Sequence, residues 1–126
     1  MEDDLLRLVK FGRCKLGGAK SYANFLKKFA QTVYSKQEVA RASIYFKALS
    51  DPIRVRIIGM LLKRSLCVCE LKIALGISQP TISYHIGLLE RAGIVEKEKR
   101  GKWTILRLRD EEVKDVLMKA LKSPVK

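Results

Sequence analysis

Three cysteines carry the most reactive side chains of the chain, and two of them, Cys67 and Cys69, are separated by one residue. Cys14 is the third. An odd number of thiols with this spacing is a poor disulfide framework, which favours reduced thiols that sense or ligate. A Cys-x-Cys pair can hold a soft metal or metalloid ion, because such ions prefer thiolate ligands. Two alternatives stay open, a redox switch and small buried cysteines that act only as weak hydrophobes.

The element that carries this pair limits how it can bind one ion. We predict a helix over residues 66–75, closed by Gly76, a typical helix-stop residue. On a regular helix, residues i and i+2 point about 200° apart. One ion can therefore hold both sulfur atoms only if the first helical turn is irregular or distorts on binding, so ligation would bend this helix.

A second group of polar side chains follows in the next helix, which Ser78 caps and Gly93 closes. Ile82, Ile86 and Leu89 recur at threes and fours and form its buried face. Amide and hydroxyl groups then lie on or beside the exposed face near the N-terminal end, where they can pair with base edges in a DNA major groove. The candidate DNA contacts of this helix are Ser78, Gln79, Thr81, Ser83, Tyr84 and His85.

His85 is the only histidine in the chain. It can donate a hydrogen bond to a phosphate, or it packs beside the core or lies in solvent. A metal or catalytic role is not expected, because it has no carboxylate partners nearby. The sequence also has no nucleophile–base pair, paired carboxylates or phosphate-binding glycine loop, so we do not expect an enzyme.

Basic residues concentrate directly after this helix. Residues 91–109 contain seven Lys or Arg and two Glu, a local charge of +5. Alternating patterns over residues 94–99 and 103–109 predict a β-hairpin with its turn at 100–102. Such a hairpin would contact phosphates or the adjacent minor groove and position the protein, although a lysine-rich edge can also serve only to prevent aggregation. We expect Trp103 to pack over the core, and the candidate contacts are Lys97, Lys99, Arg100 and Lys102.

The whole chain is strongly basic, with 26 Lys and Arg against 13 Asp and Glu and a formal net charge of +13 over 126 residues. This balance favours polyanionic partners, with nucleic acid first among them. The chain has no run of about 18–20 apolar residues that would span a membrane, and its acidic start is unlike a secretory signal. We therefore expect a cytoplasmic protein that binds DNA and no membrane.

The remaining helices must position these segments. A helical period runs from Ser21 onward, and Ser35 and Glu38 form a capping box for the next helix. Asp51 and Pro52 begin a third helix, and Asp110 is expected to cap a terminal one. Core helices, a helix-turn-helix and a basic hairpin in this order predict a mostly α winged helix-turn-helix domain. We place that domain at residues 35–126, after an N-terminal helical extension at residues 1–34.

Four segments resemble the ArsR–SmtB family of metal-responsive repressors. FKALSDPIR at residues 46–54 resembles the opening of the family domain, LCVCEL at 66–71 its thiol-bearing segment, SQPTISYHI at 78–86 its recognition helix, and RGKW at 100–103 the turn of its wing. The resemblance covers roughly residues 41–121. It implies a homodimeric repressor that binds a partly palindromic double-stranded DNA operator and releases it when a metal or metalloid binds. The interface helices would be residues 36–49 and 110–122.

The resemblance also indicates which thiols would hold the inducer. Arsenic-sensing members carry a third cysteine one helical turn after the pair, where this chain has Lys72. The cadmium- and lead-sensing branch uses two N-terminal cysteines with the pair, and this chain has one, Cys14. Cys67, Cys69 and Cys14 could thus supply three thiolates, which suit As(III), Sb(III) or Pb(II), whereas Cd(II) would require a fourth donor. No ion is expected to be needed for folding.

Other functions stay open at this point. The same fold could belong to a thiol redox-responsive regulator or to a regulator that senses no ligand. A non-specific architectural DNA binder would explain the charge and the wing without any sensor, and a protein-interaction winged helix would bind no DNA. The last helix contains no histidine, so the family's zinc site at the dimer interface is not expected.

Overall fold

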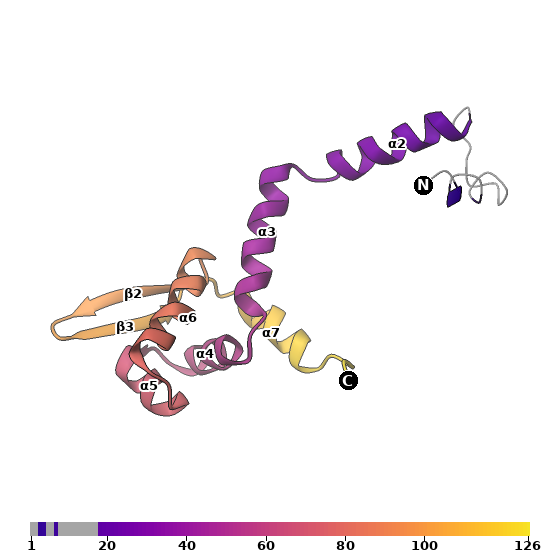
Figure 1. The fold of residues 1–126 in the computed structure, drawn as a ribbon. Helices are drawn as coiled ribbons and strands as arrows, with labels where there is room; N and C mark the ends of the chain where they lie inside the picture. Colours follow the sequence, from indigo (N-terminus) through magenta and orange to yellow (C-terminus); the bar gives the residue numbers. More distant parts are fainter. Residues whose placement is uncertain (1–2, 5–6, 8–17) are drawn as a thin grey trace. The chain divides into compact units, whose positions relative to one another are not determined.

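The computed structural model describes residues 3, 4, 7 and 18–126. From residue 18 onward it contains six helices and three strands (Figure 1). In chain order these are α2 (Ala19–Thr32), α3 (Lys36–Leu49), α4 (Pro52–Lys63), β1 (Leu66–Cys67), α5 (Val68–Leu75), α6 (Gln79–Arg91), β2 (Val95–Arg100), β3 (Trp103–Leu108) and α7 (Val113–Leu121). The chain divides into two compact units, Met1–Ala40 and Arg41–Lys126. The domain boundary placed before residue 35 stays a prediction.

The first unit contains α2 and the start of α3. The rings of Tyr22, Phe25 and Phe29 stack along α2, with centroids 6.1 and 6.0 Å apart, and no residue of α2 is buried. The predicted capping box at the start of α3 is confirmed. The Ser35 N–H donates to Glu38 Oε1 at 2.9 Å, and the Glu38 N–H donates to Ser35 Oγ at 3.1 Å.

The helix-turn-helix of the second unit consists of α5 and α6. The prediction that a helix starts at residue 66 is wrong, because Leu66 and Cys67 form β1, which pairs antiparallel with β3. The predicted end of α5 is confirmed, since Gly76 adopts a left-handed conformation with φ 64°. The predicted cap of α6 is also confirmed, because Ser78 Oγ accepts the N–H of Thr81 at 3.4 Å.

The three strands form one antiparallel sheet in the order β1-β3-β2. The β2–β3 hairpin projects from the helices of its unit (Figure 1). The sequence had placed the turn at residues 100–102. Arg100 instead pairs with Trp103 and is the last residue of β2. Gly101 has φ 62°, a conformation that glycine adopts without steric cost and that a tight turn requires.

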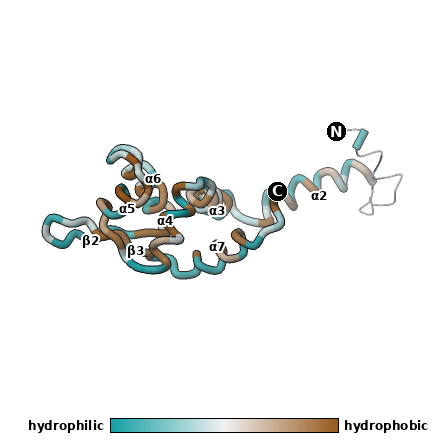
Figure 2. The backbone as a smooth tube through the Cα atoms, turned by 90° about the horizontal axis from the view of Figure 1, so that it is seen from below, coloured by the Kyte–Doolittle hydropathy of each residue, from teal (hydrophilic) through white to brown (hydrophobic). Residues whose placement is uncertain are grey.

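The core of this unit lies between the helices and the sheet. Figure 2 shows apolar chain gathering where α4, α5 and α6 meet β3, whereas the tip of the hairpin is hydrophilic. In the described part of the chain, no helix is long and apolar enough to cross a membrane. The fully buried large side chains of this core are Ile57, Ile58, Leu71, Ile82, Ile86, Leu89, Ile94, Leu106 and Val113.

The last helix begins at Val113, two residues later than a cap at Asp110 would place it. Asp110 does not cap α7, because its carboxylate accepts the Tyr45 hydroxyl at 2.9 Å and the Glu112 N–H at 3.0 Å. Burial and the hydrogen bond to Asp110 raise the pKa of Tyr45 to about 12. This contact ties α3 to the segment before α7, and α7 then buries Val113 and Leu117.

Candidate nucleic-acid interface and thiol site

Polar side chains cluster at the N-terminal end of α6. Ser78 Oγ lies 2.9 Å from Thr81 Oγ1, and Gln79 Nε2 donates to Ser83 Oγ at 3.0 Å. Gln79, Ser83 and Tyr84 are exposed, and Thr81 is half-buried. This end of the helix therefore presents amide and hydroxyl groups to solvent, as direct reading of base edges requires.

His85 does not join this exposed cluster. It is 7% exposed, because it lies between Ile82 and Ile86 on the buried side of the helical repeat. Its Nδ1 lies 2.9 Å from Arg54 Nη1 and 4.0 Å from Asp51 Oδ1. Arginine has only donors, so Nδ1 accepts this hydrogen bond. The structure thus places His85 in the interior, and not among the exposed side chains available to DNA.

Arg54 of α4 is a buried residue that holds the neighbouring helices together. Its Nε donates to the Ala48 carbonyl at 2.7 Å and its Nη2 to the Lys47 carbonyl at 3.1 Å. These are carbonyls of the last turn of α3, which have no partner within that helix. Together with the bond to His85, they tie α3, α4 and α6 together. The segment FKALSDPIR contained this residue, but nothing local indicated its partners.

The basic hairpin is partly neutralised by its own carboxylates. Arg107 binds Glu96 at 2.7 Å and Glu98 at 3.2 Å, and Arg100 binds Glu98 at 3.3 Å. Lys97 binds Glu90 of α6 at 3.1 Å, which connects the hairpin to the recognition helix. By contrast, Lys99 and Lys102 are exposed and form no ion pair with any residue that the structure describes.

Cys67 lies at the start of α5 and not within it. Its backbone is extended, with φ −79° and ψ 158°. Its Sγ accepts the Glu70 N–H at 3.4 Å, and its own N–H donates to Glu70 Oε1 at 2.9 Å. This hydrogen bond and the Cys67 side chain lower the pKa of Glu70. Cys67 therefore precedes the regular helix as its N-cap, whereas Cys69 lies within the first turn.

A pocket of about 260 Å³ brings these segments together. Both thiols of the pair line it from the start of α5; Cys67 is half-buried and Cys69 is exposed. Trp103 lines it as well and is 55% exposed, so the prediction that it packs over the core is wrong. The lining residues are Cys67, Val68, Cys69, Gln79, Ser83, Ile86, Lys97, Lys102, Trp103 and Thr104.

The donor set of this pocket fits a soft ion only in part. Two thiols are suitable ligands, but no group of three or more His, Cys, Asp or Glu side chains that could hold a metal occurs within residues 3, 4, 7 and 18–126. Cys14, the predicted third ligand, lies outside the described residues. Within the described residues, the pocket thus offers two thiols and no third ligand of these types.

Comparison with known proteins identifies the family. The family described as "Bacterial regulatory protein, arsR family" matches residues 51–97. A HTH-type transcriptional regulator of Methanocaldococcus jannaschii, MJ1325, is 38% identical over 82 residues, which cover 64% of this chain and 92% of that protein. The arsenical resistance operon repressor of Bacillus subtilis is 39% identical over 77 residues, 60% of this chain and 73% of that protein.

Two further proteins are similar to this chain. A homolog of the cadmium resistance transcriptional regulatory protein CadC from Staphylococcus aureus is 40% identical over 87 residues, 68% of this chain and 72% of that protein. HlyU from Vibrio cholerae superposes with a TM-score of 0.61 at 31% identity, over 70% of this chain and 98% of that chain, and a structure described as reduced HlyU matches with the same score and identity over 69% and 94%. The chain therefore belongs to the ArsR family of winged-helix, DNA-binding transcriptional regulators and is not an enzyme.

Proposed function

We propose that the protein is a homodimeric transcriptional repressor that binds a specific operator and releases it when a soft metal or metalloid binds Cys67 and Cys69. The observation that carries this proposal is the thiol pocket. It joins the thiols to Gln79 and Ser83 of the recognition helix and to Lys97 and Lys102 of the wing. A ligand held by the thiols therefore sits against two elements that contact DNA.

The DNA-contacting residues divide by role. The N-terminal end of α6 reads base edges in the major groove, and the wing contacts the backbone and fixes the position of the protein. His85 serves from the interior, where its bond to Arg54 holds α6 in place. The reading residues are Ser78, Gln79, Thr81 and Ser83, Tyr84 contacts DNA from the other flank of α6, and the backbone contacts of the wing are Lys97, Lys99, Arg100 and Lys102.

Ligation acts on the first turn of α5. The Cys67 sulfur accepts the Glu70 N–H, and an ion that takes this sulfur weakens that cap. Cys69 must then turn toward the same ion, which distorts the start of the helix before α6. DNA is released because the ligand binds the conformation with low DNA affinity more tightly than the DNA-bound one.

The identity of the ion follows from the number of donors. Two thiolates and a third donor suit As(III), Sb(III) or Pb(II), and Cd(II) requires a fourth. Cys14 is the proposed third ligand. Relatives named for arsenical and for cadmium resistance are about equally similar to this chain. The preference for As(III), Sb(III) or Pb(II) over Cd(II) therefore rests on the number of thiolate ligands and not on sequence identity.

Exposed apolar side chains support the homodimer. α7 buries Val113 and Leu117 but leaves Val116 40% and Leu121 65% exposed, and Phe46 of α3 is 63% exposed. In an isolated domain, only the side of the terminal helix that packs on the core needs to be apolar, so apolar residues on its other sides favour a partner. We propose that Lys36–Leu49 and the segment 110–122 form the interface between two copies.

A redox-responsive regulator is the second candidate. Cys67 and Cys69 are free, partly accessible and one residue apart, and no third ligand is present within the described residues. Thiols in such positions are open to oxidation, which would also disturb the cap of α5. A regulator that senses no ligand would leave both thiols without a role.

A titration distinguishes these candidates. Reduced protein is bound to a labelled fragment of the DNA upstream of its own gene, and arsenite, antimonite, lead, cadmium, zinc and an oxidant are added in turn while fluorescence anisotropy follows release. The proposal expects release by a soft ion, lost in Cys67→Ser and in Cys69→Ser. Cys14→Ser tests the third ligand, and release by the oxidant alone supports the redox candidate.

A further inference from the structure

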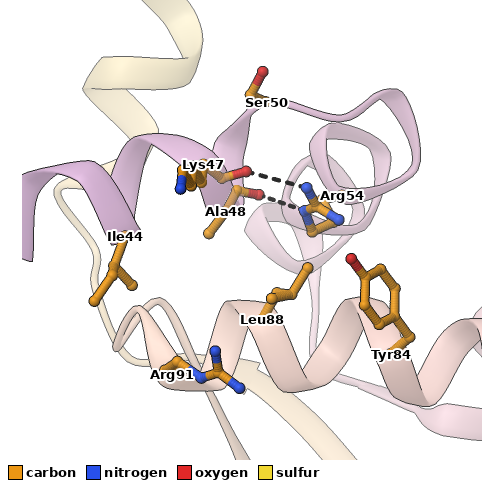
Figure 3. A pocket seen from close by; sticks show the side chains of 8 residues that line it. All are labelled: Ile44, Lys47, Ala48, Ser50, Arg54, Tyr84, Leu88 and Arg91. Carbon is orange, nitrogen blue, oxygen red and sulfur yellow. Dashed lines mark hydrogen bonds between the residues drawn. The ribbon is translucent and has the colours of Figure 1, made fainter.

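A second pocket lies on another side of α6, where the end of α3 meets α4 and α6. Its volume is about 460 Å³. Figure 3 shows Tyr84 and Leu88 pointing from α6 toward Arg54 and Ala48, with the Arg91 guanidinium turned into the same space. The lining residues are Ile44, Lys47, Ala48, Ser50, Arg54, Tyr84, Leu88 and Arg91.

This pocket is positively charged. Three cationic side chains line it and no carboxylate does. Lys47 and Arg91 are exposed and form no ion pair with any residue from 18 to 126. Arg54 is buried, and its side chain donates hydrogen bonds to two carbonyls and to His85, none of which carries a negative charge. Tyr84 adds a hydroxyl group that points into the same space (Figure 3), so the lining suits an oxyanion.

The geometry of α6 places the pocket opposite the wing. At 100° per residue, Tyr84, Leu88 and Arg91 share one flank of the helix, and Gln79, Ser83 and Glu90 lie toward the other flank. The second flank faces the wing, because Glu90 binds Lys97 and both Gln79 and Ser83 line the thiol pocket. The exposed ridge of α6 therefore runs between two basic surfaces.

A major groove has a phosphate backbone on each side. It is about 12 Å wide, and a helix with its side chains is about 10–12 Å across. A helix that enters the groove thus presents each flank to one of the two backbones. The wing supplies cations for one backbone, and the second pocket supplies them for the other.

We propose that the pocket formed by α3, α4 and α6 binds a backbone phosphate of the operator. Lys47 and Arg91 contact the phosphate, and the Tyr84 hydroxyl donates a hydrogen bond to it. Arg54 acts as a positioning residue that holds the walls of the pocket. This inference rests on the proposed DNA binding and adds a second phosphate contact to it.

The test is the salt dependence of DNA binding. Lys47→Gln/Arg91→Gln is compared with the wild type and with Arg56→Gln/Lys63→Gln, which loses the same charge at exposed sites of α4 outside the pocket. Dissociation constants are measured by anisotropy over a range of KCl for the promoter fragment and for a random duplex. We expect the slope of log K against log salt to fall by about 0.9 for each phosphate that the variant no longer neutralises, and affinity for both duplexes to fall by a similar factor. The control variant should retain the wild-type slope.

A second variant checks the result without a change in charge. Tyr84→Phe should weaken both complexes with little change in slope.

An unchanged slope in Lys47→Gln/Arg91→Gln, beside normal wild-type binding, would overturn the phosphate site and leave the repressor intact. Absence of specific binding by the wild type would instead overturn the proposed function. If inorganic phosphate raises the Tm of the wild type but not of the double variant, at matched ionic strength and with unchanged slopes, the pocket binds a soluble phosphate and the proposal is wrong.

Discussion

Arg54 connects the three helices around the recognition helix through hydrogen bonds and not through an ion pair. It satisfies two carbonyls at the end of α3 and the Nδ1 atom of His85. A buried guanidinium requires these acceptors to stay in place. The orientation of α6 therefore depends on one side chain of α4.

Replacing this residue should destabilise the domain. In Arg54→Ala, the Ala48 carbonyl and the His85 nitrogen lose their donor, and each unsatisfied buried group costs about 1–3 kcal/mol. The Lys47 carbonyl keeps the N–H of Ser50 at 3.2 Å. We expect the free energy of unfolding in urea to fall by about 2–4 kcal/mol. Arg56→Ala, an exposed site on the same helix, should change it by roughly 0.5 kcal/mol or less. Equal effects of the two variants would contradict the role given to Arg54.

Asp51 should make stability depend on acid pH. Partial burial opposes ionisation, but the N–H groups of Arg54 and Ile53, with the charge of Arg54, lower the pKa of Asp51 below 3.8. A carboxyl with a lowered folded-state pKa stabilises the protein above its unfolded value, and this contribution is lost as pH falls through the folded value. Asp51→Asn keeps a cap that does not titrate. The wild type should unfold with a larger free energy than Asp51→Asn at pH 6, and this difference should shrink below pH 4 in urea unfolding measurements. A difference that stays constant over this pH range would contradict the role of the Asp51 carboxylate.

The elements were predictable where the signal was local. The capping box of α3, the Asp-Pro start of α4 and the Gly76 end of α5 depend on residues within one turn, and the structure confirms them. β1 has only two residues and exists because Leu66 pairs with Leu106 far along the chain. No local pattern indicates such a pairing, and for that reason the helix start at residue 66 was wrong.

The candidate site was predictable in its components and not in its arrangement. Composition and periodicity identified the thiols, the polar end of α6 and the basic hairpin. The exposure of Trp103 and the burial of His85 depend on which side chains fill the core, and that is settled by tertiary packing. The pocket that joins Cys67 to the wing appears only once β1 is paired with β3.

Trp103 should report binding in the thiol pocket. It is the only tryptophan of the chain and lines the pocket beside Cys67 and Cys69. A heavy ion held by these thiols should change its fluorescence emission at a stoichiometry of one ion per site. The response should disappear in Cys67→Ser/Cys69→Ser and persist in Lys63→Gln. An unchanged emission in the wild type at saturating arsenite would contradict binding in this pocket.

At the scale of the whole molecule, the exposed apolar face of α7 should be covered by a second copy. Val116→Glu/Leu121→Glu places two charges on this face, and burying an unpaired charge is strongly unfavourable. We expect sedimentation to show a dimer for the wild type and a monomer for the variant, with much weaker binding to the promoter. Arg56→Gln/Lys63→Gln, which makes the same change in net charge at exposed positions of α4, should remain dimeric. A dimeric double variant would show that the interface lies elsewhere.

The central claim is that binding at the thiol pair is coupled to release of DNA. The most direct measurement is the dissociation constant of the reduced protein for its promoter fragment, with and without saturating arsenite, in the wild type and in Cys67→Ser/Cys69→Ser. Coupling of 1–3 kcal/mol corresponds to about 5–150-fold weaker binding. The account predicts a loss of affinity in this range for the wild type and none for the variant. Tight specific binding by the wild type that arsenite, antimonite, lead and cadmium all leave unchanged would contradict it.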